Sequence, residues 1–219
     1  MLKDGKVKYK ENKKMKVLLI NGSLHEKGCT YTALSEVEKA LNANGVETEI
    51  YWIGQNATSG CKGCWACKKT KKCVIDDGVN EFVEKCAQVD GFVFGSPVYY
   101  ASAAGALVSF MDRVFYSGGK NLAYKPAAAV VSCRRAGAST TFDVINKYFT
   151  INNMPVVGSN YWNEIHGNTA EEAAQDEEGL QTMRILGNNM AWLLKCIEKG
   201  REAGLEPVRE RKIMTNFIR

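Results

Sequence analysis

The segment CKGCWACKKTKKC, residues 61–73, places four thiols in one short stretch of chain. Two residues separate each of the first three cysteines and five separate the third from the fourth; they are Cys61, Cys64, Cys67 and Cys73. Cysteine thiolates bind iron–sulfur clusters and zinc. A compact run of this kind is typical of iron–sulfur sites, whereas structural zinc sites usually use two pairs joined by a longer spacer. We therefore favour a cluster, and keep zinc and free or partly oxidised thiols as alternatives.

The eight cysteines of this 219-residue chain are expected to be reduced. The N-terminus is rich in lysine but lacks the apolar segment of a secretory signal, so we expect a cytoplasmic protein, in which disulfides are rare. No apolar run approaches the ~20 residues that span a membrane, and we expect no membrane association. Cys86 and Cys196 fall in expected helix interiors, where we expect them to be small core residues.

The net charge of +5 is concentrated in the N-terminal lysines and in the lysines around the four cysteines. We find no interleaved aromatic residues that would stack bases, so we expect no nucleic-acid partner. Lysines beside the cysteines would instead offset the negative charge of thiolates or a cluster, or attract an acidic partner or a phosphorylated cofactor.

Apolar strand-length runs alternate five times with amphipathic helical segments. The expected strands are 16–22, 46–54, 91–97, 127–133 and 154–160, and the expected helices are 30–45, 76–88, 105–115, 139–153 and 177–200. This alternation predicts an α/β fold with a parallel sheet, covered by helices on both faces, in one doubly wound domain. We expect a basic arm at 1–14, the domain at 15–200 and a C-terminal tail at 201–219.

Ligands of such sheets bind beyond the carboxyl ends of the strands, which directs attention to the loops 21–31, 95–104 and 132–140. The first, NGSLHEKGCT, joins a strand to a helix N-terminus and offers hydroxyl and backbone donors to a phosphate. It has neither a GK[ST] nor a GxGxxG pattern, which favours a monophosphate over a dinucleotide. In the second loop Tyr99 and Tyr100 could lie against a flat ring. A planar heterocycle beside a phosphate site suggests FMN.

Three segments together resemble the NADPH-dependent FMN reductase branch of the flavodoxin-like proteins. They are LLINGSLHEKGCTYTAL, DGFVFGSPVYYASAAGALVSFMDR and DEEGLQTMRILG, and the resemblance covers about residues 15–200. With the cysteine run between the second strand and the second helix, the chain is most similar to the iron–sulfur flavoproteins of that branch. The family often has Gly-Asn-Thr in the first loop, whereas this chain has Gly28-Cys29-Thr30 and lacks the Asn side chain.

The resemblance implies a five-stranded sheet of order 2-1-3-4-5 that binds one FMN per chain. The cofactor-binding residues that it implies are Ser23, His25, Cys29, Thr30 and Tyr31 for the phosphate loop, and Pro97, Val98, Tyr99, Tyr100, Ser102, Ser132, Cys133, Arg134 and Gly137 around the ring. The stretch NEIHGNTAEE, which contains His166, is expected to cover the flavin. We assign no catalytic acid or base to the protein, because the flavin carries the chemistry.

The resemblance also implies a [4Fe–4S] cluster on Cys61, Cys64, Cys67 and Cys73, and a homodimer or homotetramer in which the cluster lies near the flavin of an adjoining subunit. The expected function is an FMN-dependent oxidoreductase that takes electrons from NAD(P)H or a ferredoxin-like donor and passes them to a small-molecule acceptor. A cluster-free NAD(P)H-dependent reductase of flavin or quinone is the alternative. A zinc-stabilised interaction domain without enzymatic activity is a distant third, since it leaves the flavin loops unexplained.

Overall fold

The computed structural model describes residues 14–55, 58–215 and 217. Its strands are β1 (Lys16–Asn21), β2 (Glu47–Trp52), β3 (Gly91–Tyr99), β4 (Ser102–Ala103), β5 (Ala127–Cys133) and β6 (Glu164–His166). Its helices are α1 (Cys29–Ala43), α2 (Ala66–Thr70), α3 (Val79–Cys86), α4 (Gly105–Gly118), α5 (Ala138–Ile151), α6 (Ala170–Ala173) and α7 (Glu177–Glu202), with a 3₁₀ turn at Gly119–Asn121.

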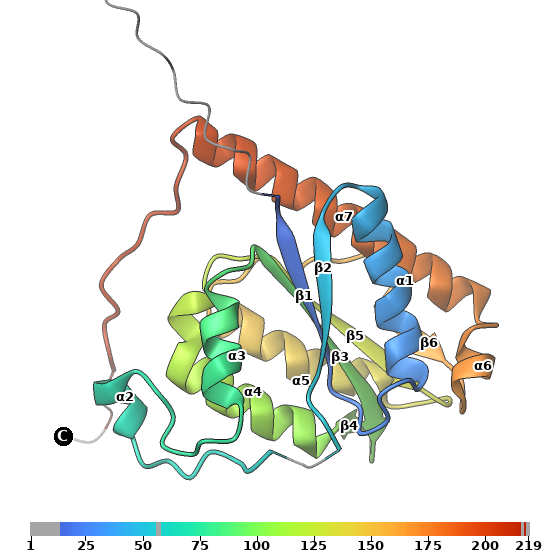
Figure 1. Ribbon diagram of the computed structural model, residues 1–219, viewed down its shortest axis with the longest axis horizontal. Coiled ribbons are helices and arrows are strands. Elements are labelled where there is room, and N and C mark those ends of the chain that lie inside the picture. The colour runs from blue at the N-terminus through green and yellow to red at the C-terminus, as the bar shows by residue number, and fades with distance from the viewer. Residues whose placement is uncertain (1–13, 56–57, 216, 218–219) are drawn as a thin grey trace, which may run out of the picture.

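Five parallel strands form the central sheet in the order β2-β1-β3-β5-β6, and the two-residue β4 folds back antiparallel on the end of β3 (Figure 1). The predicted order 2-1-3-4-5 is therefore confirmed for the parallel strands. Helices cover both faces of the sheet. Leu18 and Ile20 of β1 pack toward α3, α4 and α5, while Val17 and Leu19 pack toward α1 and α7.

The prediction for the fifth strand was wrong in its position. Instead of a strand at 154–160, the structure has one bridge between Val156 and Ala127, then a loop, and then β6. In this loop the buried Asn163 side chain donates to the carbonyl of Ala129, at 3.0 Å. A side chain thus replaces a ladder hydrogen bond where the strand is interrupted, because β5 is fully buried and its carbonyls need partners.

All eight cysteines are free. Cys86 is fully buried, as predicted, but the prediction for Cys196 was wrong because its side chain is exposed on the outer face of α7. A 26-residue helix that packs along only one side leaves several positions in solvent, and the sequence pattern did not identify Cys196 as one of them.

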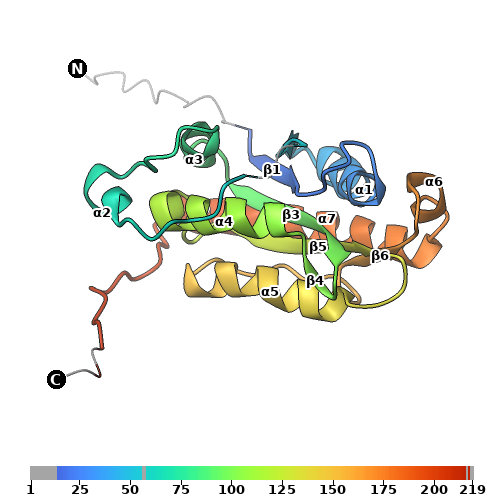
Figure 2. The same ribbon diagram turned by 90° about the horizontal axis from the view of Figure 1, so that it is seen from below.

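Most of the predicted N-terminal arm lies outside the described residues. The segment after α7 extends away from the sheet and from α2 (Figure 2), and its large apolar side chains, such as Val208 and Ile213, are exposed. None of the helices in the described part of the chain is long and apolar enough to cross a membrane.

Candidate functional site

A cleft of about 700 Å³ opens where β1, β3 and β5 end and α1 begins. The carboxyl ends of parallel strands meet at one edge of the sheet, so loops that are far apart in sequence converge here. Ten of the fourteen predicted FMN-binding residues line the cleft: Ser23, His25, Cys29, Thr30, Pro97, Val98, Tyr99, Ser132, Cys133 and Arg134.

The loop between β1 and α1 has an ordered backbone. The Ser23 hydroxyl accepts the amide of His25 at 3.1 Å, and the buried Asn21 side chain accepts the amide of Ser23 at 3.1 Å. Asn21 also donates to the carbonyl of Glu26 at 2.8 Å. Helix α1 then begins behind Gly28, which has no side chain to cap it, and its first turn carries no acidic residue. The first amides of α1 are therefore available to a phosphate, which is the ligand that a helix N-terminus favours.

The floor of the cleft is polar and buried. The hydroxyls of Thr30 and Ser132 are 2.8 Å apart and hydrogen-bonded, and this contact joins the start of α1 to the end of β5. Beside them, the buried Ser96 hydroxyl accepts the amide of Ala104 at 3.0 Å and donates to the carbonyl of Pro97 at 2.8 Å. These bonds hold the end of β3 so that Pro97 can offer an apolar surface to a ring.

Four predicted residues do not line the cleft: Tyr31, Tyr100, Ser102 and Gly137. Tyr100 is fully exposed, because it lies with Ala101 at the turn between β3 and β4, where both residues have positive φ. Gly137 is close to the cleft nevertheless, since a Cβ there would lie 2.7 Å from the Cα of Ala101 and 2.8 Å from a methyl group of Val98. It also has a φ of +87°, which favours glycine.

The structure adds residues that the sequence did not single out. Asn21 holds the phosphate loop from within, and the Trp52 indole donates to the carbonyl of Ser23 at 2.8 Å from the neighbouring strand. Gln55 also lines the cleft, and so do residues 167–171, which belong to the stretch NEIHGNTAEE that was expected to cover the flavin. His166, in the first half of the same stretch, does not line the cleft. Its Nδ1 lies 3.6 Å from a carboxylate oxygen of Asp176. The sequence feature that could have identified Asn21 is its position as a polar residue at the end of a buried apolar strand.

Both charge signs occur around the cleft. Lys27 and Arg134 line it together with Glu26 and Glu171. Burial raises the pKa of the Cys29 thiol, and the nearby Glu172 and Glu171 carboxylates raise it further. Burial also raises the pKa of the Cys133 thiol. Both thiols are therefore expected to stay protonated and to act as small neutral surfaces.

Replacing Asn21 with alanine should weaken FMN binding at least tenfold. It removes one buried and one partly buried hydrogen bond that shape the phosphate loop, at a cost of about 1–3 kcal/mol. Titrating apoprotein with FMN by fluorescence measures the effect. Asn44→Ala is the matched control, because Asn44 also makes two side-chain hydrogen bonds but at the far end of α1. An equal loss of affinity in both variants would contradict the prediction.

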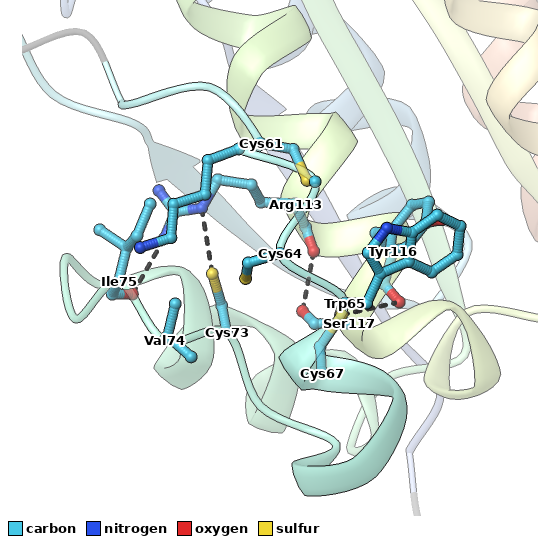
Figure 3. A pocket seen from close by; sticks show the side chains of 12 residues that line it. Cys61, Cys64, Trp65, Cys67, Cys73, Val74, Ile75, Arg113, Tyr116 and Ser117 are labelled. Carbon is cyan, nitrogen blue, oxygen red and sulfur yellow. Dashed lines mark hydrogen bonds between the residues drawn. The ribbon is translucent and has the colours of Figure 1, made fainter.

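The four predicted cluster ligands lie together in a second location. Cys61, Cys64, Cys67 and Cys73 all line one cavity against α4 (Figure 3). Positive φ values at Gly63, Trp65 and Lys71 turn the chain around it. The Trp65 ring packs edge-on against Tyr116 of α4, with centroids 5.8 Å apart, and Lys68 lies 3.5 Å from the Trp65 ring centre. In the described part of the chain, no group of three or more His, Cys, Asp or Glu side chains is arranged to hold a metal ion.

The end of this loop is fixed more firmly than its start. The side chain of Asn80 accepts the amide of Cys73 at 2.8 Å and donates to its carbonyl at 3.0 Å. From α4, Arg113 donates to the Cys73 sulfur at 3.3 Å and makes a two-pronged ion pair with Asp77, at 2.5 and 2.7 Å. The side chain of Arg113 is 1% exposed. Of the four cysteines, Cys73 is thereby held firmly against α4.

The ion pair between Arg113 and Asp77 should make stability depend on pH in acid. The hydrogen bonds from Arg113 hold the pKa of Asp77 below its ordinary value of about 3.9. Its contribution to the free energy of unfolding is therefore fully present above that value and is lost as the pH falls through the lowered pKa. Denaturant unfolding from about pH 6 to about pH 3 should show the gap between unmodified protein and Asp77→Asn narrowing. Glu84→Gln, which disrupts an exposed pair with Lys72, should show little such change.

The cysteine cavity and the cleft are separate. The segment after β2 leads from Gln55, at the cleft, to Ser59 and the cysteines, and among the described residues none lines both sites. Viewed from below, α2 projects at one end of the molecule and α6, beside the cleft, lies at the other (Figure 2).

Solved structures share this fold. RosB, in a structure with a bound flavin-derived intermediate, superposes with a TM-score of 0.66 at 14% identity, covering 94% of this chain and 93% of RosB. A flavodoxin from the domain Archaea gives a TM-score of 0.57 at 15% identity, covering 83% of this chain and 99% of the flavodoxin. At these identities the likeness shows the fold alone.

Sequence comparison gives the family. Residues 15–169 match the model of the NADPH-dependent FMN reductases. An iron–sulfur flavoprotein of Methanocaldococcus jannaschii is 36% identical over 193 residues, covering 84% of this chain and 100% of that protein. An iron–sulfur flavoprotein of Methanosarcina thermophila is 30% identical over 192 residues, covering 86% of this chain and 100% of its own length. The chain therefore belongs to the NADPH-dependent FMN reductase family, in its iron–sulfur flavoprotein branch, and is a flavin oxidoreductase.

Proposed function

We propose that this flavin oxidoreductase transfers electrons between a reduced donor and an acceptor by means of FMN in the cleft and a [4Fe–4S] cluster on Cys61, Cys64, Cys67 and Cys73. The observation that carries the proposal is the convergence of these four thiols on one cavity, anchored to α4, in a chain whose strand ends form a flavin-sized cleft. When bound, FMN would supply redox chemistry in steps of two electrons or one, and the cluster would supply one-electron transfer.

The residues of the cleft would bind and orient FMN. The amides at the start of α1 would receive the phosphate, and the Thr30–Ser132 pair would fix the spacing between that loop and the ring-binding strand ends. Pro97 and Val98 would support the ring, while Arg134, exposed at the rim, would attract the negative charge of a reduced flavin or of a cofactor phosphate. This positioning is the contribution of the protein to the reaction.

We further propose a cytoplasmic homodimer or homotetramer in which the cysteine loop of one chain approaches the cleft of another. The supporting observation is that the two sites share no lining residue among the described ones. The donor in this proposal is NAD(P)H or a ferredoxin-like protein. Exposed lysines around the cysteines, such as Lys62 and Lys69, suit an acidic protein partner.

The test is anaerobic purification followed by a visible spectrum and by iron, sulfide, zinc and FMN analysis of the same sample. We expect flavin bands with broad additional absorbance and about four irons and four sulfides per chain. Flavin bands without iron, with steady NAD(P)H oxidation, would replace the proposal with a cluster-free reductase. A colourless, zinc-containing protein would overturn it altogether.

A further inference from the structure

Arg113 is the most deeply buried charged group in the described part of the chain, with 1% of its residue surface exposed. Every nitrogen of its guanidinium group donates a hydrogen bond. The acceptors are the Cys73 sulfur at 3.3 Å, the Ser59 carbonyl at 3.1 Å, the Ile75 carbonyl at 2.9 Å and the two carboxylate oxygens of Asp77. Its own backbone carbonyl accepts the Ser117 hydroxyl at 2.7 Å.

These acceptors lie on both sides of the cysteine run. Ser59 precedes the first cysteine, and Ile75 and Asp77 follow the last. The run between them buries little, since α2 has no buried residue. One side chain of α4 therefore closes the loop at its base and also points its Nε–H at a sulfur of the loop. The guanidinium group has five N–H donors, and the Cys73 sulfur accepts the one that Asp77 and the two carbonyls leave over, so burial of Arg113 ties this sulfur to α4.

We propose that Arg113 is a positioning residue that fixes Cys73 as a ligand and raises the reduction potential of the cluster. This inference rests on the proposed function, because it requires the cluster. A hydrogen bond to a ligand sulfur and a nearby positive charge both stabilise the more negative, reduced state of a cluster. Asp77 acts in the opposite direction, since its carboxylate offsets the arginine charge. The Arg113–Asp77 pair would thus set the potential through the balance of its two charges.

Two single substitutions make the proposal testable by the sign of their effects. Arg113→Gln removes the positive charge and the donor to Cys73, and it should lower the midpoint potential of the cluster. A tenfold change in the equilibrium is expected, which is about 59 mV for a one-electron couple. Asp77→Asn removes the negative charge and should raise the potential. Arg184→Gln is the control for loss of an arginine charge, because Arg184 forms an exposed pair with Glu36 on α1, away from the loop.

The measurement is a potentiometric titration of anaerobically prepared protein, followed by cluster absorbance and electron paramagnetic resonance, with iron and FMN content from the same samples. Opposite shifts in the two variants, with Arg184→Gln unchanged, would support the proposal. If Arg113→Gln retains FMN but loses iron, the positioning role of Arg113 is supported. The midpoint potential of Asp77→Asn then decides whether the ion pair affects the potential of the cluster.

Full iron content with unshifted potentials, or with shifts of the same sign in both variants, would overturn this inference and leave the proposed function intact. Absence of iron from the unmodified protein would instead overturn the proposed function, and this inference with it.

Discussion

Replacing Cys64 with alanine is expected to remove essentially all iron and sulfide from the protein while leaving about one FMN per chain. Cys64 is one of the four thiols around the cavity on α4, and a compact cluster loop has no spare ligand in its run. The flavin cleft contains none of these four cysteines, so the flavin bands should persist when the additional absorbance is lost. Iron, sulfide and FMN assays on anaerobically purified variant and unmodified protein measure the outcome.

Cys196→Ala is the matched control for this experiment. Cys196 is an exposed free thiol on α7, away from the cysteine cavity, so its loss changes the thiol count without touching the loop. Iron content should be unaffected. If Cys64→Ala kept its iron and sulfide, or if both variants lost them equally, the assignment of residues 61–73 as the cluster loop would be wrong.

Replacing Gly95 with alanine is expected to cost about 1–3 kcal/mol of unfolding free energy and to weaken FMN binding at least tenfold. A Cβ at Gly95 would lie 2.8 Å from a methyl carbon of Thr30 and 2.9 Å from one of Leu34, both on α1. The added methyl group would therefore push α1 away from β3. Because Thr30 also forms the floor of the cleft with Ser132, the same displacement would disturb the cofactor site.

Gly91→Ala tests whether the effect comes from this close approach or from any added methyl group in β3. Gly91 is buried in the same strand, but a Cβ there would make only ordinary contacts, the nearest at 3.4 Å from the Pro126 carbonyl oxygen and from a Val17 methyl group. It should change stability by less than about 1 kcal/mol and FMN affinity very little. Denaturant unfolding and FMN titration of both variants supply the comparison, and equal effects would contradict the argument.

The parallel sheet and the edge at which the cleft lies followed from the alternation of strands and helices, and the strand order followed from the resemblance to the flavodoxin-like family. Buried strands such as β1 and β5 are continuous apolar runs, and each alternates with an amphipathic helix, which leaves few topologies. Such a sheet brings the loops after all of its parallel strands to one edge. Residues as distant in sequence as Ser23 and Cys133 could therefore be assigned to one site before any contact between them was known. The four cysteines were likewise grouped by their spacing.

The tertiary structure decided which side chains within those loops face the site. Tyr99 lines the cleft and Tyr100 does not, because the backbone turns at Tyr100 with a φ of +49°, and the tyrosine types carry no information about that turn. The fifth strand likewise moved to β6, since the pairing of Val156 with Ala127 ends after one bridge. The apolar residues around Val156 show the same local sequence pattern whether they form a full strand or a single bridge.

Arg113 is the clearest case of a residue whose role the sequence did not predict and the tertiary structure shows. It lies 36 residues from Asp77 and 40 from Cys73 along the chain, inside a helix whose other buried positions are apolar or small. The spacing of apolar residues in a helix predicts which of its positions are buried. A charged residue such as Arg113 is then assigned to the face in contact with solvent. Only the docking of the cysteine loop onto α4 provides the acceptors that make its burial favourable. The sequence by itself therefore predicted most of the strands and helices and grouped the four thiols, and long-range packing determined the residue that holds Cys73.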